Sequence, residues 1–171
     1  MAINVFFDTE FTRFRDLEHE PKLISIGLVA DDGREFYREL LDTWGISDCS
    51  DFVRAVVLGL LDNQEFIKEA DLAVQLCDWI ESLGAQEVVL RCDAPAYDWT
   101  FVQELFRFYG TWPANLRRKV GTVYFDDDRQ IHRYQAATAM YWKEHGDRQH
   151  HALVDARAMR FAWRHAIRRG V

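Results

Sequence analysis

Residues 5–10 read VFFDTE, an apolar run that ends in two acids separated by one residue. The apolar run predicts a buried strand. Because side chains alternate between the two faces of a strand, Asp8 and Glu10 are expected on the same face. Neighbouring carboxylates repel each other unless a cation lies between them. Both acids offer oxygen ligands, so the pair indicates a hard divalent ion such as Mg²⁺ or Mn²⁺. Two solvated acids at a strand end are the alternative interpretation.

The composition predicts one globular domain. The chain has 171 residues, of which 49% are hydrophobic and 14% aromatic, and this suits a single core for residues 1–171. No apolar run approaches the roughly 18 residues of a membrane span, and the N-terminus lacks a signal-peptide pattern. Cys49, Cys77 and Cys92 lack a metal-binding spacing, which favours free thiols. We therefore expect a cytoplasmic protein that does not contact membranes.

The net charge is −7, which argues against a nucleic-acid-binding protein because such proteins are usually basic. The argument weakens if several acids hold metal, since two divalent cations would cancel four of these charges. Basic residues concentrate near the C-terminus, at Arg157, Arg160, Arg164, Arg168 and Arg169. A solvated helix face is the expected structure there, with phosphate or subunit binding as the alternative.

The hydrophobic pattern predicts a mixed α/β sheet. Residues 23–30 and 34–40 predict antiparallel strands joined by a tight turn at 31–33, and 3–8 predicts the strand before them. The later elements are expected at 50–83 (helix, ended by Gly84), 87–91 (strand), 97–109 (helix), 122–125 (strand) and 152–168 (helix). A hairpin followed by alternating strands and helices is typical of this fold class.

A third acid, Asp98, follows the strand at 87–91 through a short loop. Pro95 disfavours helix before it, which places Asp98 in the first turn of the next helix. An acid in this position also stabilises a helix start, so a purely structural role is the alternative. Asp93, at the strand end, is a rival candidate.

A fourth acid, Asp155, falls on the apolar side of the last helix. At about 100° per residue, it shares a stripe with Ala156, Met159, Ala162, Trp163 and Ala166. The arginines of this helix lie on the opposite side and cannot pair with it. Because a buried, unpaired carboxylate is costly and usually has a cation partner, a metal is the expected partner.

Two histidines precede the same helix. His150 lies five residues before Asp155 and is expected on the entering loop, whereas His151 lies four before it and can share its face if the helix begins early. A neutral imidazole beside a metal site can accept a proton from water. A surface histidine pair is the alternative, and the six histidines form no zinc motif.

Three segments together resemble the motifs of the DEDDh 3′→5′ exonucleases, which include the proofreading subunits of DNA polymerases, oligoribonuclease and RNase T. They are residues 8–10 (DTE), 97–98 (YD) and 150–156 (HHALVDA). The second motif commonly carries His-Asn upstream, where this chain has Cys92 and Asp93. In this region, residues 93–99 most resemble the RNase AS-like branch of bacterial and phage exoribonucleases.

The resemblance implies an RNase H-like fold, with a five-stranded mixed sheet and helices on both faces. It implies two divalent cations, Mg²⁺ or Mn²⁺, and His150 as the general base. The implied metal ligands are Asp8, Glu10, Asp98 and Asp155. Two ions can activate water and stabilise the leaving oxygen in phosphodiester hydrolysis. The implied activity is removal of 5′-mononucleotides from the 3′ end of single strands.

Aromatic residues near these motifs are candidates for binding the substrate. Phe11, Phe14 and Tyr97 can stack on terminal bases, with core packing as the alternative. Thr9, which lies between the first two acids, is a further candidate for binding the substrate. The sequence does not identify the contacts that distinguish RNA from DNA. A short stand-alone domain favours RNA, and a DNA-directed exonuclease is the alternative.

Other classes of protein remain open. A catalytically inactive nucleic-acid-binding relative is one, although all the motif residues are present. A phosphatase of the haloacid dehalogenase type is another, but its motif is D-x-D, and Glu10 occupies the second position here. We also expect a homodimer, because Trp112, Tyr141 and Trp142 exceed the evident needs of one core and the C-terminal arginines can meet the acids at 126–128 of a partner.

Overall fold

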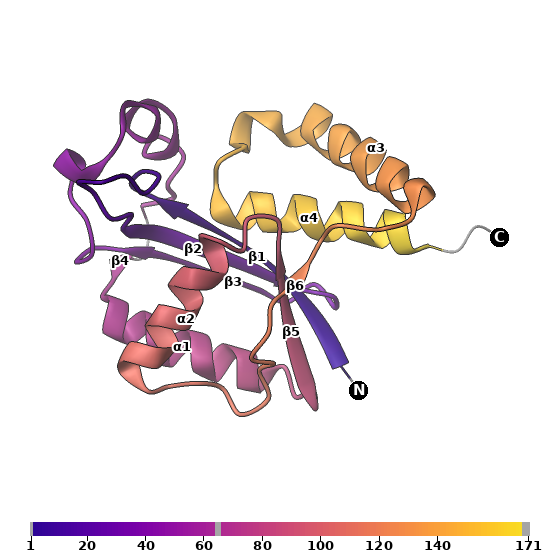
Figure 1. The fold of residues 1–171 in the computed structure, drawn as a ribbon, viewed down its shortest axis with the longest axis horizontal. Helices are drawn as coiled ribbons and strands as arrows, with labels where there is room; N and C mark the ends of the chain where they lie inside the picture. The colour runs from indigo at the N-terminus through magenta and orange to yellow at the C-terminus, as the bar shows by residue number, and fades with distance from the viewer. Residues whose placement is uncertain (1, 64–65, 169–171) are drawn as a thin grey trace.

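The computed structural model describes residues 2–63 and 66–168. The strands are β1 (Ala2–Phe11), β2 (Leu23–Ala30), β3 (Glu35–Leu40), β4 (Phe66–Ile67), β5 (Glu87–Cys92) and β6 (Gly121–Thr122). The helices are α1 (Glu69–Ser82), α2 (Asp98–Tyr109), α3 (Asp128–His145) and α4 (Ala152–Ile167). The strands form one mixed sheet in the order β4-β3-β2-β1-β5-β6. Helices α1 and α2 cover one face of the sheet, α4 covers the other, and α3 packs on α4 (Figure 1).

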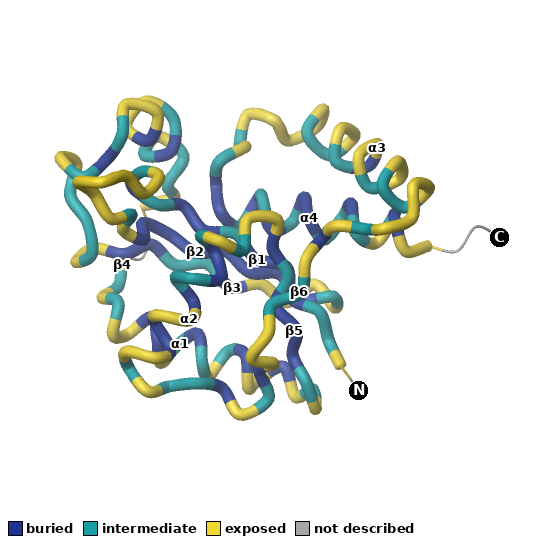
Figure 2. Tube along the Cα trace, viewed as in Figure 1, coloured by how far each residue is buried: buried dark blue, intermediate teal, exposed yellow. Residues whose placement is uncertain are grey.

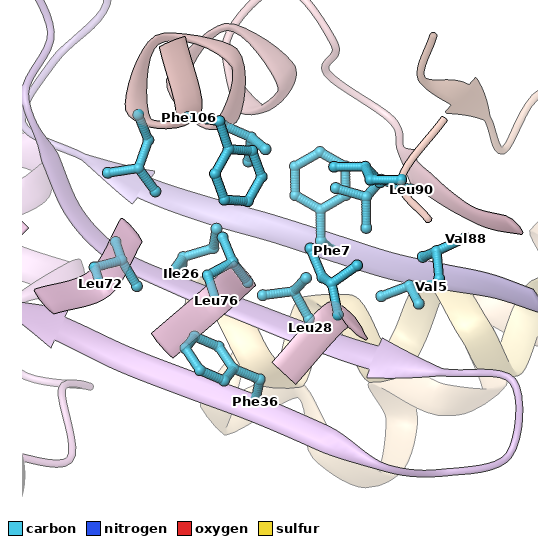
Figure 3. Close-up of a cluster of buried hydrophobic side chains, with 14 of the residues drawn as sticks. Val5, Phe7, Ile26, Leu28, Phe36, Leu72, Leu76, Val88, Leu90 and Phe106 are labelled. Carbon is cyan, nitrogen blue, oxygen red and sulfur yellow. The ribbon is translucent and has the colours of Figure 1, made fainter. Parts of the chain in front are cut away.

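The central strand β1 pairs antiparallel with β2 and parallel with β5. Its side chains alternate between two buried layers. Phe7 points into the main core with α1 and α2 (Figure 3), whereas Phe6 packs with Met159 of α4. The same alternation places Asp8 and Glu10 on the α4 side of the sheet, as their spacing predicts.

Helix α4 begins in direct contact with the backbone of β2. Gly27 lies opposite Asp8 in the β1–β2 ladder. A Cβ atom at Gly27 would lie 2.2 Å from the backbone nitrogen of Leu153, far inside any real contact. Only glycine at this position therefore lets the first turn of α4, which carries Asp155, lie this close to the acidic end of β1.

The opening hairpin and the ends of two helices follow the sequence pattern. The turn at 31–33 contains Gly33 with φ +97°, and it joins β2 to β3 as an antiparallel pair. Gly84 and Gly110, with φ of +67° and +66°, follow α1 and α2. A left-handed residue past the last turn suits glycine because it has no Cβ. The predicted mixed α/β architecture is confirmed.

The periodicity at 50–83 predicts one helix, and this prediction is wrong. The stretch contains a π-helical turn at Val53–Val57, the short strand β4 and helix α1; residues 64–65 lie outside the described residues. Strand β4 pairs parallel with β3 at the sheet edge, so the sheet has six strands instead of the five expected. The strand expected at 122–125 is limited to β6, at Gly121–Thr122.

Helix α3 is not evident from the sequence, because the segment is polar and only Ala137 in it is buried. Figure 2 shows most of this helix exposed. It packs along α4 and not on the sheet. One local signal is present: Asp127 caps its N-terminus by accepting a hydrogen bond from the Gln130 backbone nitrogen at 3.0 Å.

The aromatic residues that suggest a dimer contact other parts of the same chain. Trp112 packs edge-on against two aromatic rings of α2. Tyr141 packs against an aromatic ring of α4, and Trp142 lines the cavity described below. These contacts remove the sequence argument that the three rings are surplus to one core.

The arginine face of α4 is partly engaged within the chain, in contrast to the solvated face expected. Arg157 forms an ion pair of 2.6 Å with Glu35 of β3, and Arg160 donates to the carbonyl oxygen of Asp31 at 2.7 Å. Arg169 lies outside the described residues. In the part of the chain that the structure covers, no helix is long and apolar enough to cross a membrane.

Candidate active site

A cavity of about 670 Å³ lies at the carboxyl end of β1, where α2, α3 and α4 converge. All the residues predicted for the site line it. They are Asp8, Thr9, Glu10, Phe11, Phe14, Tyr97, Asp98, His150 and Asp155. They come from β1 and the loop after it, the start of α2 and the start of α4, so the fold brings together three segments that are far apart in the sequence.

The titratable groups of the cavity form two triads. In one, single ligand atoms of Glu10, His150 and Asp155 lie within 4.8 Å of one another. In the other, carboxylate oxygens of Asp8, Asp93 and Asp98 lie within the same distance. The two acids of the D-x-E pair thus contribute to different triads. Asp93, the rival to Asp98 from the sequence, lies beside it and does not replace it.

Asp98 is held rigidly at the floor of the cavity. Its Oδ1 accepts hydrogen bonds from the Thr9 hydroxyl at 2.6 Å and the Thr9 backbone nitrogen at 3.2 Å. The side chain is only 1% exposed, and Oδ2 is buried without a hydrogen-bond partner among the described residues. A buried oxygen in this state is costly unless a further group binds it.

In Asp155, as in Asp98, one carboxylate oxygen accepts a hydrogen bond and the other has no partner within the described part of the chain. Its Oδ2 accepts a hydrogen bond from the His150 backbone nitrogen at 3.1 Å. Its Oδ1 is buried and has no such partner in the described ranges. Each anchored acid therefore has one oxygen fixed by the protein and one left for a ligand.

The site raises the pKa of all four motif acids. Burial, followed by repulsion from Asp155 and Asp98, raises the pKa of Glu10 to about 8. Burial also raises the pKa values of Asp98 and Asp155 to about 7, partly offset by the hydrogen bonds that each accepts. Burial and then repulsion from neighbouring acids hold the pKa of Asp8 well above its usual range. The carboxylates are thus unfavourable as anions in the absence of positive charge.

The donor set fits divalent cations. Five carboxylates line the cavity, and Arg13 is the one lysine or arginine among the described residues that line it. Its Nε donates to the carbonyl oxygen of Asp48 at 2.6 Å. Hard oxygen ligands, two buried carboxylate oxygens without a partner and mutual repulsion are the features expected of residues that would hold Mg²⁺ or Mn²⁺.

The two histidines have different environments. His150 lies on the loop before α4 with φ +72°, lines the cavity and packs edge-on against Phe52. His151 is 3% exposed, stacks on Tyr37 with ring centroids 4.5 Å apart, and places Nε2 3.4 Å from Oδ1 of Asp62. Of the two, His150 is therefore the histidine that lies beside the acids of the cavity.

The aromatic candidates form one cluster on the wall of the cavity. Phe11 and Tyr97 stack with ring centroids 5.1 Å apart and an interplanar angle of 10°. Phe14 packs edge-on against both and is 69% exposed. Phe11 also contacts Phe101 of α2. Phe11 is thus largely committed to packing, whereas Phe14 offers an accessible ring surface.

Four further residues that line the cavity were not predicted from the sequence. Tyr134, Thr138 and Trp142 of α3 line the cavity, as does Phe52 beside the π-helical turn. The three α3 residues follow a spacing of four, which places them on one helix face. The cap at Asp127 together with this spacing is the signal that could have found them.

No family model matches the sequence, and no curated protein matches it. Solved structures do match. The nuclease domain of 3′hExo, a DEDDh family member bound to rAMP, is 16% identical, with a TM-score of 0.62 over 95% of this chain and 90% of that one. Exonuclease I from E. coli in complex with a dT13 oligonucleotide is 13% identical, with a TM-score of 0.59 over 94% of this chain and 40% of that one.

These identities are low, and the likeness establishes the fold: it is the RNase H-like α/β fold of these exonucleases, as expected from the sequence. The chain spans 40% of the length of exonuclease I in the dT13 complex. It spans nearly the whole nuclease domain of 3′hExo.

Proposed function

We propose that this protein is a metal-dependent 3′→5′ exonuclease that hydrolyses single-stranded nucleic acid, with RNA preferred, to 5′-mononucleotides. The observation that carries the proposal is the convergence of four buried or half-buried acids and His150 in one cavity. Two of the acids keep a buried oxygen without a partner among the described residues. The shared fold with known exonucleases supports the same function.

The acids would hold two divalent cations, with Asp8, Glu10, Asp98 and Asp155 as ligands. When bound, such ions neutralise charge on the scissile phosphate and help to ionise water. The protein supplies fixed ligands, since Thr9 holds Asp98 and the His150 backbone holds Asp155. Without these ions the cavity would repel a phosphate, because Arg13 is the sole lysine or arginine on the described part of its wall.

His150 is proposed to take the proton from the attacking water. Its ring nitrogen lies within 4.8 Å of carboxylate oxygens of Glu10 and Asp155, so water held beside these acids is within reach. A neutral imidazole beside bound water is a competent general base. His150 has a left-handed backbone and lines the cavity, and His151, which follows it, is the N-cap of α4.

Binding of the 3′-terminal nucleotide is assigned to the aromatic wall. The exposed ring of Phe14 offers a surface on which a base can stack, backed by Tyr97 and Phe11. Stacking tolerates every base and suits an enzyme that removes nucleotides in sequence. Trp142 and Tyr134 of α3 add two further aromatic rings to the lining of the cavity.

The preference for RNA and the RNase AS-like branch are part of the proposal. The 3′hExo domain was solved with rAMP, which supports a ribonucleotide in this fold. Exonuclease I was solved with dT13, which supports DNA as the second candidate substrate.

One assay tests the proposal directly. Purified protein is incubated with Mg²⁺ or Mn²⁺ and matched 5′-labelled RNA and DNA single strands. The expected result is progressive shortening from the 3′ end with release of 5′-mononucleotides, faster on RNA, and none in EDTA. A 3′-phosphate should block the reaction and a 5′ block should not. Equal loss of circular and linear strands, or release of inorganic phosphate alone, would contradict it.

A homodimer and a cytoplasmic location are further parts of the proposal. All the predicted site residues come from one chain, so the dimer is not needed to complete the site. Light scattering decides between a mass near the 20.2 kDa of the chain and twice that value. The three free cysteines agree with a reducing compartment.

A further inference from the structure

Asp93 lies where β5 ends and the loop to α2 begins. The hydroxyl of Tyr124 donates to its carbonyl oxygen at 2.7 Å. The next residue, Ala94, accepts hydrogen bonds from the backbone nitrogens of Tyr97 and Asp98 at 2.9 and 3.0 Å. This tight turn brings the carboxylates of Asp93 and Asp98 to the same side of the loop, beside Asp8.

A second observation indicates that this triad binds a ligand. Asp98 is 1% exposed, and Thr9 fixes one of its oxygens. The other oxygen is buried without a partner among the described residues. Because Asp98 cannot turn toward solvent, its second oxygen must be satisfied from within the cavity.

We propose that Asp93 is a fifth acidic ligand, which holds the second divalent cation together with Asp8 and Asp98. The first cation is then held by Glu10 and Asp155, beside His150. This assignment rests on the proposed function and adds a residue to it. The motif that the sequence resembles commonly has a neutral Asn at the position of Asp93, so the extra charge is a departure from that motif.

The spacing of the triad suits one cation after a small adjustment. Ligands on opposite sides of an Mg²⁺ ion lie about 4.2 Å apart, since each bond is roughly 2.1 Å. The oxygens of Asp8, Asp93 and Asp98 lie within 4.8 Å. The exposed side chain of Asp93 can rotate to close the difference, whereas Asp98 is fixed.

The charge balance is compatible with five acidic ligands. Five carboxylates line the cavity, and two divalent ions supply four positive charges, so the filled site carries a net charge of only −1. The exposed position of Asp93 also implies that the second ion binds more weakly than the first, because a mobile ligand loses rotamer freedom on binding.

The test is Mn²⁺ binding to the purified protein by calorimetry, without nucleic acid. Wild type should bind two ions, one tighter than the other. Asp93→Asn should keep the tighter ion and weaken the other at least about tenfold. Asp126→Asn is the matched control, since Asp126 lies outside the cavity lining and its substitution changes the net charge equally. In nuclease assays, Asp93→Asn should need correspondingly more Mn²⁺, and Asp126→Asn should not.

Two outcomes would overturn the assignment. The first is two ions bound to Asp93→Asn with wild-type affinities. The second is an equal loss of Mn²⁺ affinity in Asp93→Asn and Asp126→Asn, which would show that the loss comes from the change in net charge alone. Either result leaves the proposed nuclease function intact. A wild-type protein that binds no Mn²⁺ and cleaves no strand would instead contradict the proposed function itself.

Discussion

The hydroxyl of Thr9 donates a hydrogen bond of 2.6 Å to Oδ1 of Asp98, which ties the D-x-E strand to the first turn of α2. Thr9 lies between the two acids of β1, and its side chain faces away from them toward α2. One residue of the strand thus positions an acid that comes from a different element. The middle residue of the motif contributes to the geometry of the site through Asp98.

Replacing this hydroxyl should weaken both the fold and the site. Thr9→Val keeps the shape but leaves Oδ1 of Asp98 with only the backbone bond at 3.2 Å. The expected loss is about 1–3 kcal/mol of unfolding free energy and about 10–100-fold in activity. Urea unfolding and initial rates measure the two effects. Thr9→Ser, which retains a hydroxyl, is the control. If Thr9→Val and Thr9→Ser had equal stability and activity, the hydrogen bond from the hydroxyl to Asp98 would be unimportant.

The metal-free protein should lose stability as the pH rises from about 6.5 to 8.5. The folded pKa values of about 8 for Glu10 and about 7 for Asp98 and Asp155 lie above the values near 4 of unfolded chains. The folded protein therefore holds more protons. Its extra stability is complete below pH about 4 and is lost through these folded pKa values, at up to about 1.4 kcal/mol per pH unit for each retained proton.

Thermal melts in EDTA check this slope. Burial lowers the pKa of His151, which acts in the opposite direction below pH about 6.5, so the comparison begins there. Added Mg²⁺ should reverse the trend, because it binds the ionised acids. A metal-free protein that gains stability toward alkaline pH would rule out this account of the acids.

Asp155→Asn should abolish cleavage and yet raise thermal stability in EDTA. The amide keeps an oxygen for the His150 backbone bond and removes a charge that burial makes unfavourable. A gain of about 1 kcal/mol corresponds to a rise in Tm of about 2–4 °C. Asp8→Asn should behave similarly. If Asp155→Asn instead melted at a lower temperature than wild type in EDTA, protein groups would already satisfy the carboxylate of Asp155.

Two variants of His150 separate its chemistry from its backbone conformation. His150→Ala and His150→Gly should both reduce the chemical step about 10²–10⁴-fold, the usual contribution of a general base. Because φ is +72°, the Gly variant should be more stable than the Ala variant by about 1 kcal/mol. Single-turnover rates and chemical denaturation provide the two measurements. A larger rate loss in His151→Ala would identify the other histidine as the base.

Gly27→Ala should be severely destabilising. The added Cβ would lie 2.2 Å from the Leu153 nitrogen and 2.5 Å from the Ala152 carbonyl carbon, and both are backbone atoms of α4 that cannot rotate away. We expect a loss beyond about 3 kcal/mol, as for overpacked cores. Gly146→Ala is the control, since no described atom outside its own helical turn lies within 4 Å of its Cβ position. Equal stability of the two variants would show that α4 shifts freely.

The sequence brought together the acids that line the cavity, but it did not reveal the α3 residues that line it as well. Alternation along a strand gives the shared face of Asp8 and Glu10, and helical periodicity places Asp155 toward the core, because both depend only on local geometry. Helix α3 packs on α4 with only Ala137 buried, which leaves little hydrophobic pattern to detect. Because α3 cannot be recognised from the sequence, Trp142 of this helix suggests a dimer interface there, whereas in the structure it lines the cavity.

The mixed region at 50–83 shows a second limit. Apolar residues at helical spacing predict one helix over the interval, but pairing with β3 recruits Phe66 and Ile67 into the sheet. Such long-range pairing cannot be seen in local periodicity. Asp93 is recognisable as an acid at the strand end, but its position beside both Asp8 and Asp98 depends on the turn at Ala94.

The close fit of α4 on Gly27 has a consequence for the order in which activity arises during synthesis. Helix α4 follows β1, β5 and α2 in the chain, so a growing polypeptide exposes Asp8, Glu10 and Asp98 before Asp155 and His150 leave the ribosome. On the proposed function, we expect the nascent chain to be inactive toward the messenger that encodes it until α4 docks on β2.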